Sequence, residues 1–383
     1  MKGHIRKRGK GSWSIVLDIG RDTTGKRRQK WHSVKGTKRD AEQEMARLIS
    51  EIYTGGYVEP SRLTVADYVR KWLQDAAARV APKTLERYQG IMEGHVIPAL
   101  GRVLLPKLKP LHIQSFYAKA LAEGRKDGKG GLSSQSVLHF HRVLHKALEQ
   151  AVKWQLLVRN PADAVQPPRP QRQQMAALNE QEISALLKSL EGNRLYLPVT
   201  MAVATGLRRG ELLALRWQDI DLESAQLTVA RSLEQTKGNL NFKAPKTDRS
   251  RRRIALPQVI VRLLRAHKAK QAQWRLKLGP LYQDQDLILA RVDGAPWLPD
   301  TFSTAFADHI RRHPKLTKVR FHDLRHTHAT QLLKQGVHPK IVSERLGHSN
   351  ISITLDTYSH VLPGMQEQAI AALDASLSAA IEP

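Results

Sequence analysis

The stretch between positions 321 and 358 combines several cationic side chains with one tyrosine, in the sequence FHDLRHTHATQLLKQGVHPKIVSERLGHSNISITLDTY. His322 and Arg325 are three residues apart, His348 follows a glycine typical of a helix end, and a tyrosine comes ten residues later, at Tyr358. Cations grouped in this way favour an anion, and the planar guanidinium of arginine matches a phosphate with two hydrogen bonds. A tyrosine beside a cation-bound phosphate is a candidate nucleophile. We therefore expect this stretch to act on a phosphodiester.

Two further segments contain charges that such a reaction needs. In TGLRRGELLALRW, we expect Arg208 at the start of a helix, where backbone N–H groups also favour an anion, and Glu211 just inside that helix. Arg208 and Arg325 would neutralise the charge that develops on the non-bridging oxygens of the phosphate. Lys246 lies in the hairpin segment FKAPKTDRS and would protonate the leaving 5′-oxygen.

The protonation of the histidines and of the tyrosine decides how this chemistry would proceed. His322 and His348 can donate hydrogen bonds, and near neutral pH either can carry or pass a proton. The ordinary pKa of a tyrosine, near 10, is too high for attack at neutral pH. We expect the surrounding cations to lower the pKa of Tyr358 by favouring its phenolate form.

Histidines at these spacings also have to be weighed as metal ligands. His322 and His326 are four residues apart, but a hydrolytic zinc helix has a glutamate after its first histidine, whereas Asp323 follows here. No carboxylate or cysteine completes a ligand set with the histidines of a second group, His139, His141 and His145. The sequence has no cysteine, which excludes disulfides and thiolate ligands. We expect no metal and no other cofactor.

The composition favours a polyanionic partner. The 383 residues have a formal net charge of +27 and a pI of about 10.4, far beyond what solubility requires. Nucleic acid is the first candidate for the partner, and a membrane surface is the weaker one. The sequence has neither an apolar run long enough to cross a membrane nor an apolar signal segment. We expect a cytoplasmic protein of two or three domains that associates with the nucleoid when it binds DNA.

Residues 1–58 are expected to form a small basic sheet with one helix. Residues 1–39 contain 13 Lys and Arg against two acidic residues. A strand-like alternation is carried by Trp13, Ile15, Leu17 and Ile19. A turn signal then separates it from a second extended stretch at 27–34, which predicts a hairpin. A basic β-ribbon can enter a DNA groove, so Arg27, Arg28 and Lys30 are candidate DNA contacts, the alternative being a solvated charged surface.

The next two parts of the chain differ in their patterns. Residues 62–163 show several apolar stripes at helical spacing without catalytic residues, which predicts a helical domain that binds the duplex backbone. A Pro- and Gln-rich linker follows at 161–175. Residues 175–383 mix helices with short strands, and end in an amphipathic segment at 367–377. A basic run in this part is expected to position phosphates, and consists of Arg249, Arg251, Arg252 and Arg253. The fold class is therefore mainly α with small antiparallel β-sheets.

The order of five motifs resembles the tyrosine recombinases, also called the phage integrase family. These motifs are TGLRRGE, the hairpin PKT-x-x-S, H-x-x-R, LGH and a tyrosine ten residues further on. The resemblance is specific over about 175–365, and the two N-terminal segments are more loosely similar to the arm-site sheet domain and the SAM-like core-site domain of integrases. It implies a catalytic set of Arg208, Lys246, His322, Arg325, His348 and Tyr358, with Glu211 and Asp323 in support. Only motif position favours Arg208 over Arg209, and Lys246 over Lys237 and Lys243.

The resemblance also implies an activity. Such enzymes join the 3′-phosphate of DNA to the tyrosine, release a 5′-hydroxyl, and exchange strands through a Holliday junction within a homotetramer. They use neither metal nor ATP, and the sequence has no phosphate-binding G-x-x-x-x-G-K-[ST] loop. The implied partners are duplex DNA at core and arm attachment sites, DNA-bending accessory proteins and an excisionase. The implied task is to integrate or excise a phage or mobile element, with the C-terminal segment exchanged between subunits.

Three other functions have to be weighed against site-specific recombination. A DNA-binding architectural protein on the same scaffold would have no reason to keep a complete catalytic set. A type IB topoisomerase uses similar motifs, but the basic N-terminal sheet favours an integrase. A metal-dependent nuclease would need a cluster of carboxylates, which the sequence does not show.

Overall fold

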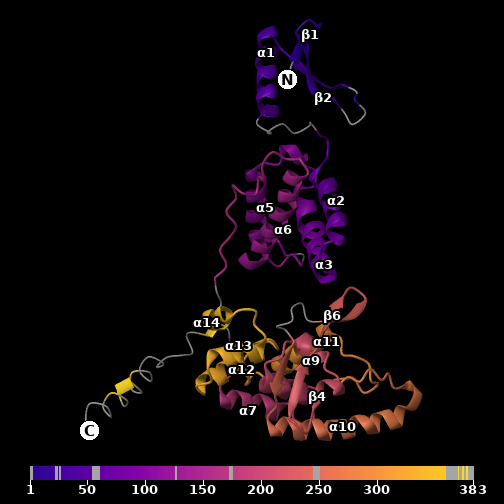
Figure 1. Cartoon of the computed structure of the whole chain (residues 1–383), viewed down its shortest axis with the longest axis vertical. Coiled ribbons are helices and arrows are strands. Elements are labelled where there is room, and N and C mark those ends of the chain that lie inside the picture. Colours follow the sequence, from indigo (N-terminus) through magenta and orange to yellow (C-terminus); the bar gives the residue numbers. More distant parts are fainter. Residues whose placement is uncertain are drawn as a thin grey trace. The chain divides into compact units, whose positions relative to one another are not determined.

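The computed structural model describes residues 3–21, 25, 27–53, 61–125, 127–171, 176–244 and 251–358, together with positions 370, 373, 374 and 377. The chain divides into two compact units, Met1–Arg172 and Gln173–Pro383 (Figure 1). Both units are mainly helical with small antiparallel sheets, so the predicted fold class is confirmed. Lys246, Arg249 and most of the predicted C-terminal segment 367–377 lie outside the described residues.

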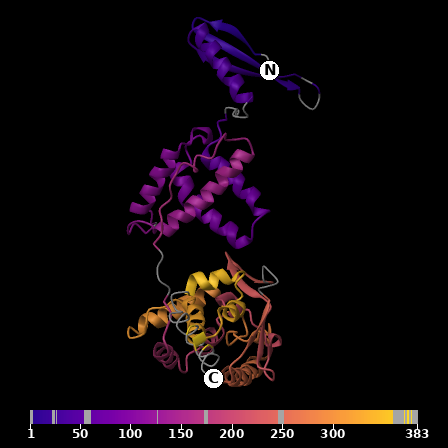
Figure 2. The same cartoon turned by 60° about the vertical axis from the view of Figure 1, so that its left-hand side comes forward.

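An antiparallel three-stranded sheet and one helix form the N-terminal part. The elements are β1 (Gly3–Gly9), β2 (Ser12–Arg21), β3 (Arg27–Lys35) and α1 (Lys38–Tyr53). The predicted hairpin is β2–β3, whereas β1 was not predicted, because its basic run hides the pairing of Ile5 with Ile15. Helix α1 packs along one face of the sheet, where Leu48 joins Ile15 and Leu17 in a small core (Figures 1 and 2).

Residues 61–171 are built of helices. They are α2 (Val65–Ala77), α3 (Pro82–Ile91), the π-helical turn η1 (Met92–Val96), α4 (Ile97–Leu100), the 3₁₀ turn η2 (Leu105–Lys107), α5 (Pro110–Glu123) and α6 (Ser134–Lys153). His141 bonds the Tyr117 hydroxyl through Nδ1 at 3.1 Å, and His145 bonds Asp163 at 2.8 Å. These histidines therefore serve packing contacts within the helical part.

The second unit combines helices with two small sheets. Its helices are α7 (Glu180–Ser189), α8 (Tyr196–Thr205), α9 (Arg209–Leu213), α10 (Gln258–Leu278), α11 (Pro299–Arg312), α12 (Asp323–Lys334), α13 (Pro339–Leu346) and α14 (Ile351–Tyr358), with 3₁₀ turns η3 (Trp217–Asp219) and η5 (Gly279–Leu281). One sheet has the order β4 (Ile220–Asp221), β5 (Gln226–Val229), β8 (Arg252–Ala255), and the other pairs β6 (Ser232–Thr236) with β7 (Asn239–Lys243). The hairpin segment that contains Lys246 begins within β7, where Phe242 pairs with Leu233.

Local signals in the sequence fix where several helices begin. The hydroxyl of Thr64 accepts a hydrogen bond from the Asp67 backbone N–H at 3.1 Å. Asn179 Oδ1 accepts from the Glu182 backbone N–H at 2.9 Å, and the Glu182 carboxylate accepts from the Asn179 backbone N–H at 2.8 Å. These side chains satisfy backbone groups that the first helical turn leaves unpaired.

Packing in the second unit brings together the helices α8, α12, α13 and α14. Helix α8 is largely buried and lies in the main core with α9, α11 and the start of α12. A smaller cluster joins α12, α13 and α14 through Leu333, Leu346 and Tyr358. This cluster fixes α14 and therefore the position of Tyr358.

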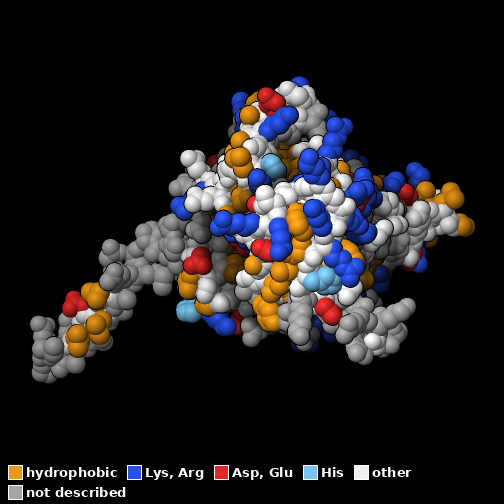
Figure 3. All heavy atoms as spheres, turned by 90° about the horizontal axis from the view of Figure 1, so that it is seen from above, with side chains coloured by type: hydrophobic (Ala, Val, Ile, Leu, Met, Phe, Trp, Pro, Cys, Tyr) orange, Lys and Arg blue, Asp and Glu red, His pale blue; other side chains and the backbone are white. Residues whose placement is uncertain are grey.

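The surface of the described residues is strongly basic. Lys and Arg side chains far outnumber Asp and Glu on the face that Figure 3 shows. In the part of the chain that the structure describes, we find no helix long and apolar enough to cross a membrane.

Candidate active site

Arg208 and Glu211 are positioned by the start of α9. Arg208 is the N-cap residue of this helix, and Glu211 lies in its first turn, as the sequence predicted. The Glu211 carboxylate accepts hydrogen bonds from the Arg208 backbone N–H at 3.0 Å and from its Nη1 at 2.8 Å. The Arg208 side chain nevertheless remains 41% exposed. An anion can therefore reach this guanidinium from solvent.

Arg252, the first residue of β8, also binds the Glu211 carboxylate. Its guanidinium donates to the Glu211 carboxylate at 2.8 and 3.2 Å and to the Arg345 backbone carbonyl at 2.7 Å. The side chain is 6% exposed, so the prediction that Arg252 contacts phosphates is wrong. Burial opposes ionisation of Glu211, but hydrogen bonds and charges from Arg252 and Arg208 outweigh it and bring the pKa of Glu211 to about 2. Glu211 is therefore a buried carboxylate shared by two arginines.

Arg325, in the first turn of α12, is enclosed by the protein and only 4% exposed. Its guanidinium donates to the backbone carbonyls of Gly206 at 2.8 Å and Leu346 at 2.7 Å. These carbonyls lie at the C-terminal ends of α8 and α13, where helix dipoles favour a cation. Burial and the charge of Arg208 lower the pKa of Arg325 to about 9, so it remains charged at neutral pH.

The C-terminal end of α13 also explains how two arginines share one site. Arg208 Nη2 donates to the Gly347 carbonyl at 3.2 Å, next in sequence to the Leu346 carbonyl that Arg325 uses. Gly206 and Gly347 have φ angles of 66° and 67°, and an added Cβ would meet neighbouring side chains at 2.6 and 2.9 Å. Glycine is therefore needed at both helix ends, whose carbonyl dipoles offset the repulsion between the arginines.

His322 and Asp323 occupy the start of α12. His322 is its N-cap residue and remains accessible to solvent. The buried carboxylate of Asp323 accepts hydrogen bonds from the Arg320 backbone N–H at 2.7 Å and from its Nη2 at 2.8 Å. Desolvation and the charge of Arg325 lower the pKa of His322. Asp323 thus fixes the entry into α12, and His322 is an accessible imidazole whose lowered pKa favours the neutral form.

His348 follows the C-terminal glycine of α13. Its Nδ1 lies 2.8 Å from the hydroxyl of Thr354, which is buried in α14. Burial, followed by the charges of Arg325 and Arg208, lowers the pKa of His348 to about 4. The prediction that His348 can carry a proton near neutral pH is therefore wrong. A neutral imidazole with one N–H can still donate a hydrogen bond.

Tyr358 ends α14 and is 2% exposed. Its hydroxyl lies 2.7 Å from Nδ1 of His326. Burial raises the pKa of Tyr358 to about 12, and the charge of Arg325 opposes this rise without overcoming it. The predicted lowering of this pKa is therefore wrong, because the sequence shows the neighbouring cations but not the burial of the phenol.

The contact between His326 and Tyr358 was not predicted from the sequence. The spacing of His326 from His322 indicated only a candidate metal ligand, although a position one turn after His322 puts both on one helix face. His328 is also occupied, since its Nδ1 lies 2.8 Å from the Val203 carbonyl and its Nε2 accepts from Arg345 Nε at 3.0 Å. Among the described residues, no group of three or more His, Asp or Glu side chains could hold a metal ion.

The contacts of Arg209 and Lys243 show where these alternatives to Arg208 and Lys246 point. Arg209 turns toward α11, where its Nη1 donates to the Pro299 carbonyl at 2.8 Å and to Ser303 Oγ at 2.7 Å. Lys243 forms an ion pair with Glu234 across the β6–β7 hairpin. These contacts direct Arg209 and Lys243 to partners outside the group formed by Arg208 and Arg325.

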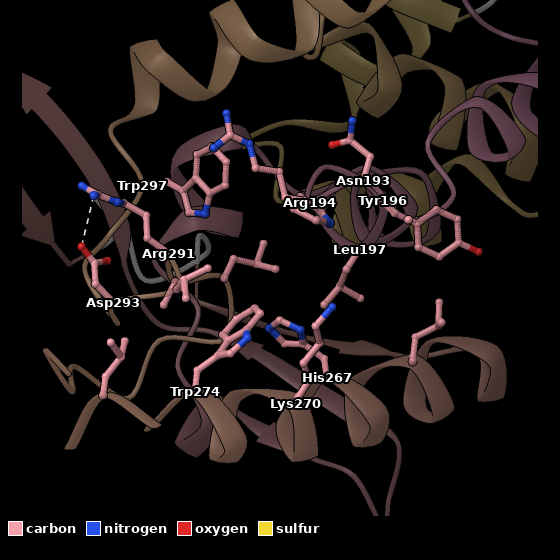
Figure 4. Close-up of a pocket in the computed structure, with 17 residues that line it drawn as sticks. Asn193, Arg194, Tyr196, Leu197, His267, Lys270, Trp274, Arg291, Asp293 and Trp297 are labelled. Carbon is pink, nitrogen blue, oxygen red and sulfur yellow. Dashed lines mark ion pairs between the residues drawn. The ribbon is translucent and has the colours of Figure 1, made fainter. Parts of the chain in front are cut away.

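Of two hollows in the second unit, only one is lined by residues of the predicted site. One, of about 630 Å³, is lined by His348, Gly347, Arg251 and Lys340 among others. It therefore extends from the site to an exposed arginine that the sequence predicted as a phosphate contact. The other, of about 700 Å³, lies between α8 and α10, and none of the predicted site residues lines it (Figure 4). Arg194 there lies over the Trp297 ring, and Arg291 pairs with Asp293.

The N-terminal sheet contains the other predicted DNA contacts. Arg27, Arg28 and Lys30 all lie in β3. On the same strand Trp31 is 53% exposed, and the Arg6 guanidinium lies over its ring at 5.5 Å. Strand β3 therefore has an accessible aromatic side chain next in sequence to one of the predicted contacts, Lys30.

Comparison with protein families gives three matches that follow one another along the chain. Residues 176–364 match the phage integrase family, residues 64–121 the N-terminal SAM-like domain of phage integrases, and residues 4–52 an arm DNA-binding domain. Relatives include a protein named tyrosine recombinase XerC-like from Caldanaerobacter subterraneus, 31% identical over 97% of this chain and 98% of its own length. The ICEBs1 integrase of Bacillus subtilis is 27% identical over 97% of this chain and 99% of its own.

Solved structures share the fold. A fragment of the integrase of transposon Tn1549, residues 82–397, in complex with a circular intermediate DNA, matches with a TM-score of 0.67 and 21% identity, over 81% of this chain and 99% of the fragment. A lambda integrase tetramer bound to a Holliday junction matches with a TM-score of 0.55 and 19% identity, over 91% of this chain and 94% of that one.

Proposed function

Because this chain belongs to the phage integrase family, the tyrosine site-specific recombinases, we propose that it cuts and rejoins duplex DNA through a covalent link between a 3′-phosphate and Tyr358. The observation that supports this assignment is the group formed at the C-terminal ends of α8 and α13. There Arg208 and Arg325 donate to adjacent carbonyls, and His348 follows directly in the chain. In this proposal the scissile phosphate lies between these cations and Tyr358.

Arg208 and Arg325 act on the charge of the phosphate. Attack places additional negative charge on the non-bridging oxygens, and donors fixed beforehand stabilise that charge without reorganising. Arg325 is held by two carbonyls, and Arg208 by Glu211 and one carbonyl. Glu211 and Asp323 contribute by fixing the starts of α9 and α12. Catalysis therefore depends on the position of these cations as much as on their number.

The remaining members move or direct protons. His322 and His348 are neutral and act as hydrogen-bond donors to the phosphate oxygens. Lys246, on the segment between β7 and β8, protonates the 5′-oxygen as it leaves. Tyr358 loses its proton to solvent during attack, because its pKa of about 12 keeps it protonated before the phosphate is bound. This proton balances the one that Lys246 gives to the 5′-oxygen. The 5′-hydroxyl of a second strand then attacks the phosphotyrosyl bond, which conserves the energy of the broken bond without metal or ATP.

The DNA is bound by three domains, with boundaries at 1–58, 62–163 and 175–383. The first domain contacts arm sites through Arg27, Arg28 and Lys30, and the second binds the core-site backbone. Arg249 and Arg251 position phosphates beside the catalytic group. The solved complexes of Tn1549 integrase with DNA and of the lambda tetramer on a Holliday junction support duplex DNA as the partner and a homotetramer as the assembly.

The biological task in this proposal is to integrate or excise a phage or mobile element. DNA-bending proteins and an excisionase would assist at the arm sites, and the residues near 367–377 would be exchanged between subunits. A protein that acts on chromosomal DNA works in the cytoplasm, at the nucleoid.

The test traps the covalent intermediate. A labelled duplex from the junction of the host element, nicked just 3′ of the scissile position, loses the fragment needed for religation. We expect wild type to form an adduct that survives a denaturing gel, and Tyr358→Phe to form none while it still binds the duplex. Tyr282→Phe, at a tyrosine outside the site, is the matched control and should react like wild type.

The outcomes separate the candidate functions. An adduct that persists in Tyr358→Phe would show that another residue is the nucleophile. Tight binding without any adduct, across several junction sequences, would contradict the proposal and favour an architectural DNA-binding protein.

A further inference from the structure

His326 is the partner of the nucleophile proposed above. Its Nδ1 lies 2.7 Å from the Tyr358 hydroxyl oxygen, and the two ring centroids are 5.8 Å apart. Within the part of the chain that the structure describes, the Tyr358 hydroxyl has no other hydrogen-bond partner. A phenol that is 2% exposed would otherwise leave its polar oxygen unsatisfied in the protein interior.

The surroundings of His326 fix its protonation. Its ring lies 5.3 Å from that of His322, at an interplanar angle of 89°. Burial and then the proximity of His322 lower the pKa of His326 to about 4, with Arg325 and Arg320 acting in the same direction and Asp323 opposing them. The imidazole is therefore neutral at physiological pH and has one nitrogen that accepts and one that donates.

The same contact fixes the direction of the phenol proton. At neutral pH Tyr358 is protonated, so its O–H donates and Nδ1 of His326 accepts, which leaves the proton of His326 on Nε2. A hydroxyl that donates to one fixed acceptor keeps its lone pairs directed away from that acceptor. Attack on phosphorus requires such a lone pair in line with the bond that breaks.

We propose that His326 is a positioning residue for the nucleophile, whose Nδ1 holds the Tyr358 hydroxyl so that a lone pair of its oxygen faces the scissile phosphate. The proposal rests on the proposed function, because it requires Tyr358 to be the nucleophile. His326 acts on Tyr358 alone and makes no contact with the leaving 5′-oxygen. A histidine that only fills space in the core would affect stability but not the chemical step.

The experiment measures single-turnover cleavage of the nicked junction duplex by the full-length chain. The variants are His326→Ala, which removes the acceptor, and His326→Asn, whose side-chain oxygen can lie near the position of Nδ1. His313→Ala, at an exposed histidine of the same unit, is the matched control. The dissociation constant for the same duplex is measured in parallel and shows whether each variant is folded and binds DNA.

We expect His326→Ala to form the adduct roughly 100-fold more slowly than wild type, with an unchanged dissociation constant, since misplacing a reacting atom has effects of this size. His326→Asn should return the rate to within about fivefold of wild type, because it restores the acceptor. Equal rates for wild type and His326→Ala would overturn the proposal. An Asn variant that binds DNA but is as slow as the Ala variant would also overturn it, since the imidazole would then have a role beyond accepting this bond.

A second substrate distinguishes a defect in attack by Tyr358 from a defect in departure of the 5′-oxygen. When sulfur replaces the bridging 5′-oxygen, the leaving group is a better one and departs without a proton from an acid. The defect of His326→Ala should persist on this duplex, whereas that of Lys246→Ala should be relieved. Relief of the His326→Ala defect would place His326 at the leaving group and contradict the proposal. Tyr358→Phe tests the proposed function itself. The proposal for His326 can therefore fail while the proposed function holds.

Discussion

The N-terminal sheet and the proposed catalytic group around Arg208 and Arg325 are both rich in arginine, but the arginine side chains have different surroundings. On β1, Arg6, Lys7 and Arg8 are exposed. Arg325 and Arg252 are enclosed and donate to backbone carbonyls or a carboxylate. An exposed cation adapts to any phosphate that approaches, whereas an enclosed one is fixed before the phosphate arrives. We therefore expect the number of charges to govern affinity for DNA, and their enclosure to govern chemistry.

The comparison predicts its largest effect for a substitution that keeps the charge. Arg325→Lys retains a cation, but one ammonium cannot reproduce the planar donation to the Gly206 and Leu346 carbonyls. We expect single-turnover adduct formation to fall by about 1,000-fold. Arg6→Lys, the matched change on the sheet, should alter DNA affinity by about twofold or less, since a surface contact needs only a point charge. Equal effects of the two substitutions would remove the distinction between the regions.

The two regions should also differ in how much a carboxylate stabilises the fold. Glu211→Gln removes a charge that Arg208 and Arg252 share, and it leaves the buried guanidinium of Arg252 without its counter-ion. We expect a loss of about 3–5 kcal/mol in the free energy of unfolding. Glu44→Gln breaks an exposed pair with Arg47 on α1 and should lose about 1 kcal/mol or less.

Urea unfolding followed by circular dichroism measures both changes in the full chain. Separate transitions for the two units would let each substitution be assigned to its own unit. A loss for Glu211→Gln no larger than that for Glu44→Gln would show that the buried ion pair contributes little.

The enclosed site should lose stability in acid. His326, His328 and His348 each have a folded-state pKa of about 4, below the ordinary value of about 6.5. Protonation therefore favours the unfolded chain, so their contribution is complete above pH 6.5 and falls as the pH drops toward 4. The contribution of Glu211, whose pKa is about 2, is complete above about pH 4.5 and falls below it.

Thermal unfolding followed between pH 7.5 and 4.5 measures this loss. We expect the melting temperature of the second unit to fall steadily below pH 6.5, and less steeply in His328→Asn, which removes one titrating group. A melting temperature that stays constant over this range would contradict the lowered histidine pKa values.

Short-range features of the site could be predicted from the sequence, and long-range ones could not. The cap of α9 pairs Arg208 with Glu211 three residues away, so a local pattern contains it. The bond from Arg208 to Gly347 spans 139 residues, and that from His326 to Tyr358 spans 32. Such contacts follow from the packing of α8, α12, α13 and α14, which no spacing in the sequence specifies.

The wrong predictions have one physical cause. The sequence shows that cations lie near Tyr358 and His348, but desolvation depends on which atoms surround a group in three dimensions. It therefore predicted a lowered pKa for Tyr358, where burial raises it. Arg252 was expected on the surface, because it lies in a run of basic residues. Its inward position follows from the alternation of side chains along β8, and this requires knowing where the strand begins and which of its faces is buried.

The smallest predicted effect concerns the exposed cations. Each phosphate contact releases counter-ions, so the logarithm of the binding constant changes with the logarithm of the salt concentration by about 0.9 per contact. Arg27→Ala with Arg28→Ala should reduce this slope by about 2 for DNA that contains arm sites, and should leave the rate of adduct formation on a core-only duplex unchanged. Lys188→Ala, at an exposed lysine of α7, should leave the slope unchanged. A slower chemical step in the double variant would mean that the sheet contributes to catalysis, and the division between affinity and chemistry would then fail.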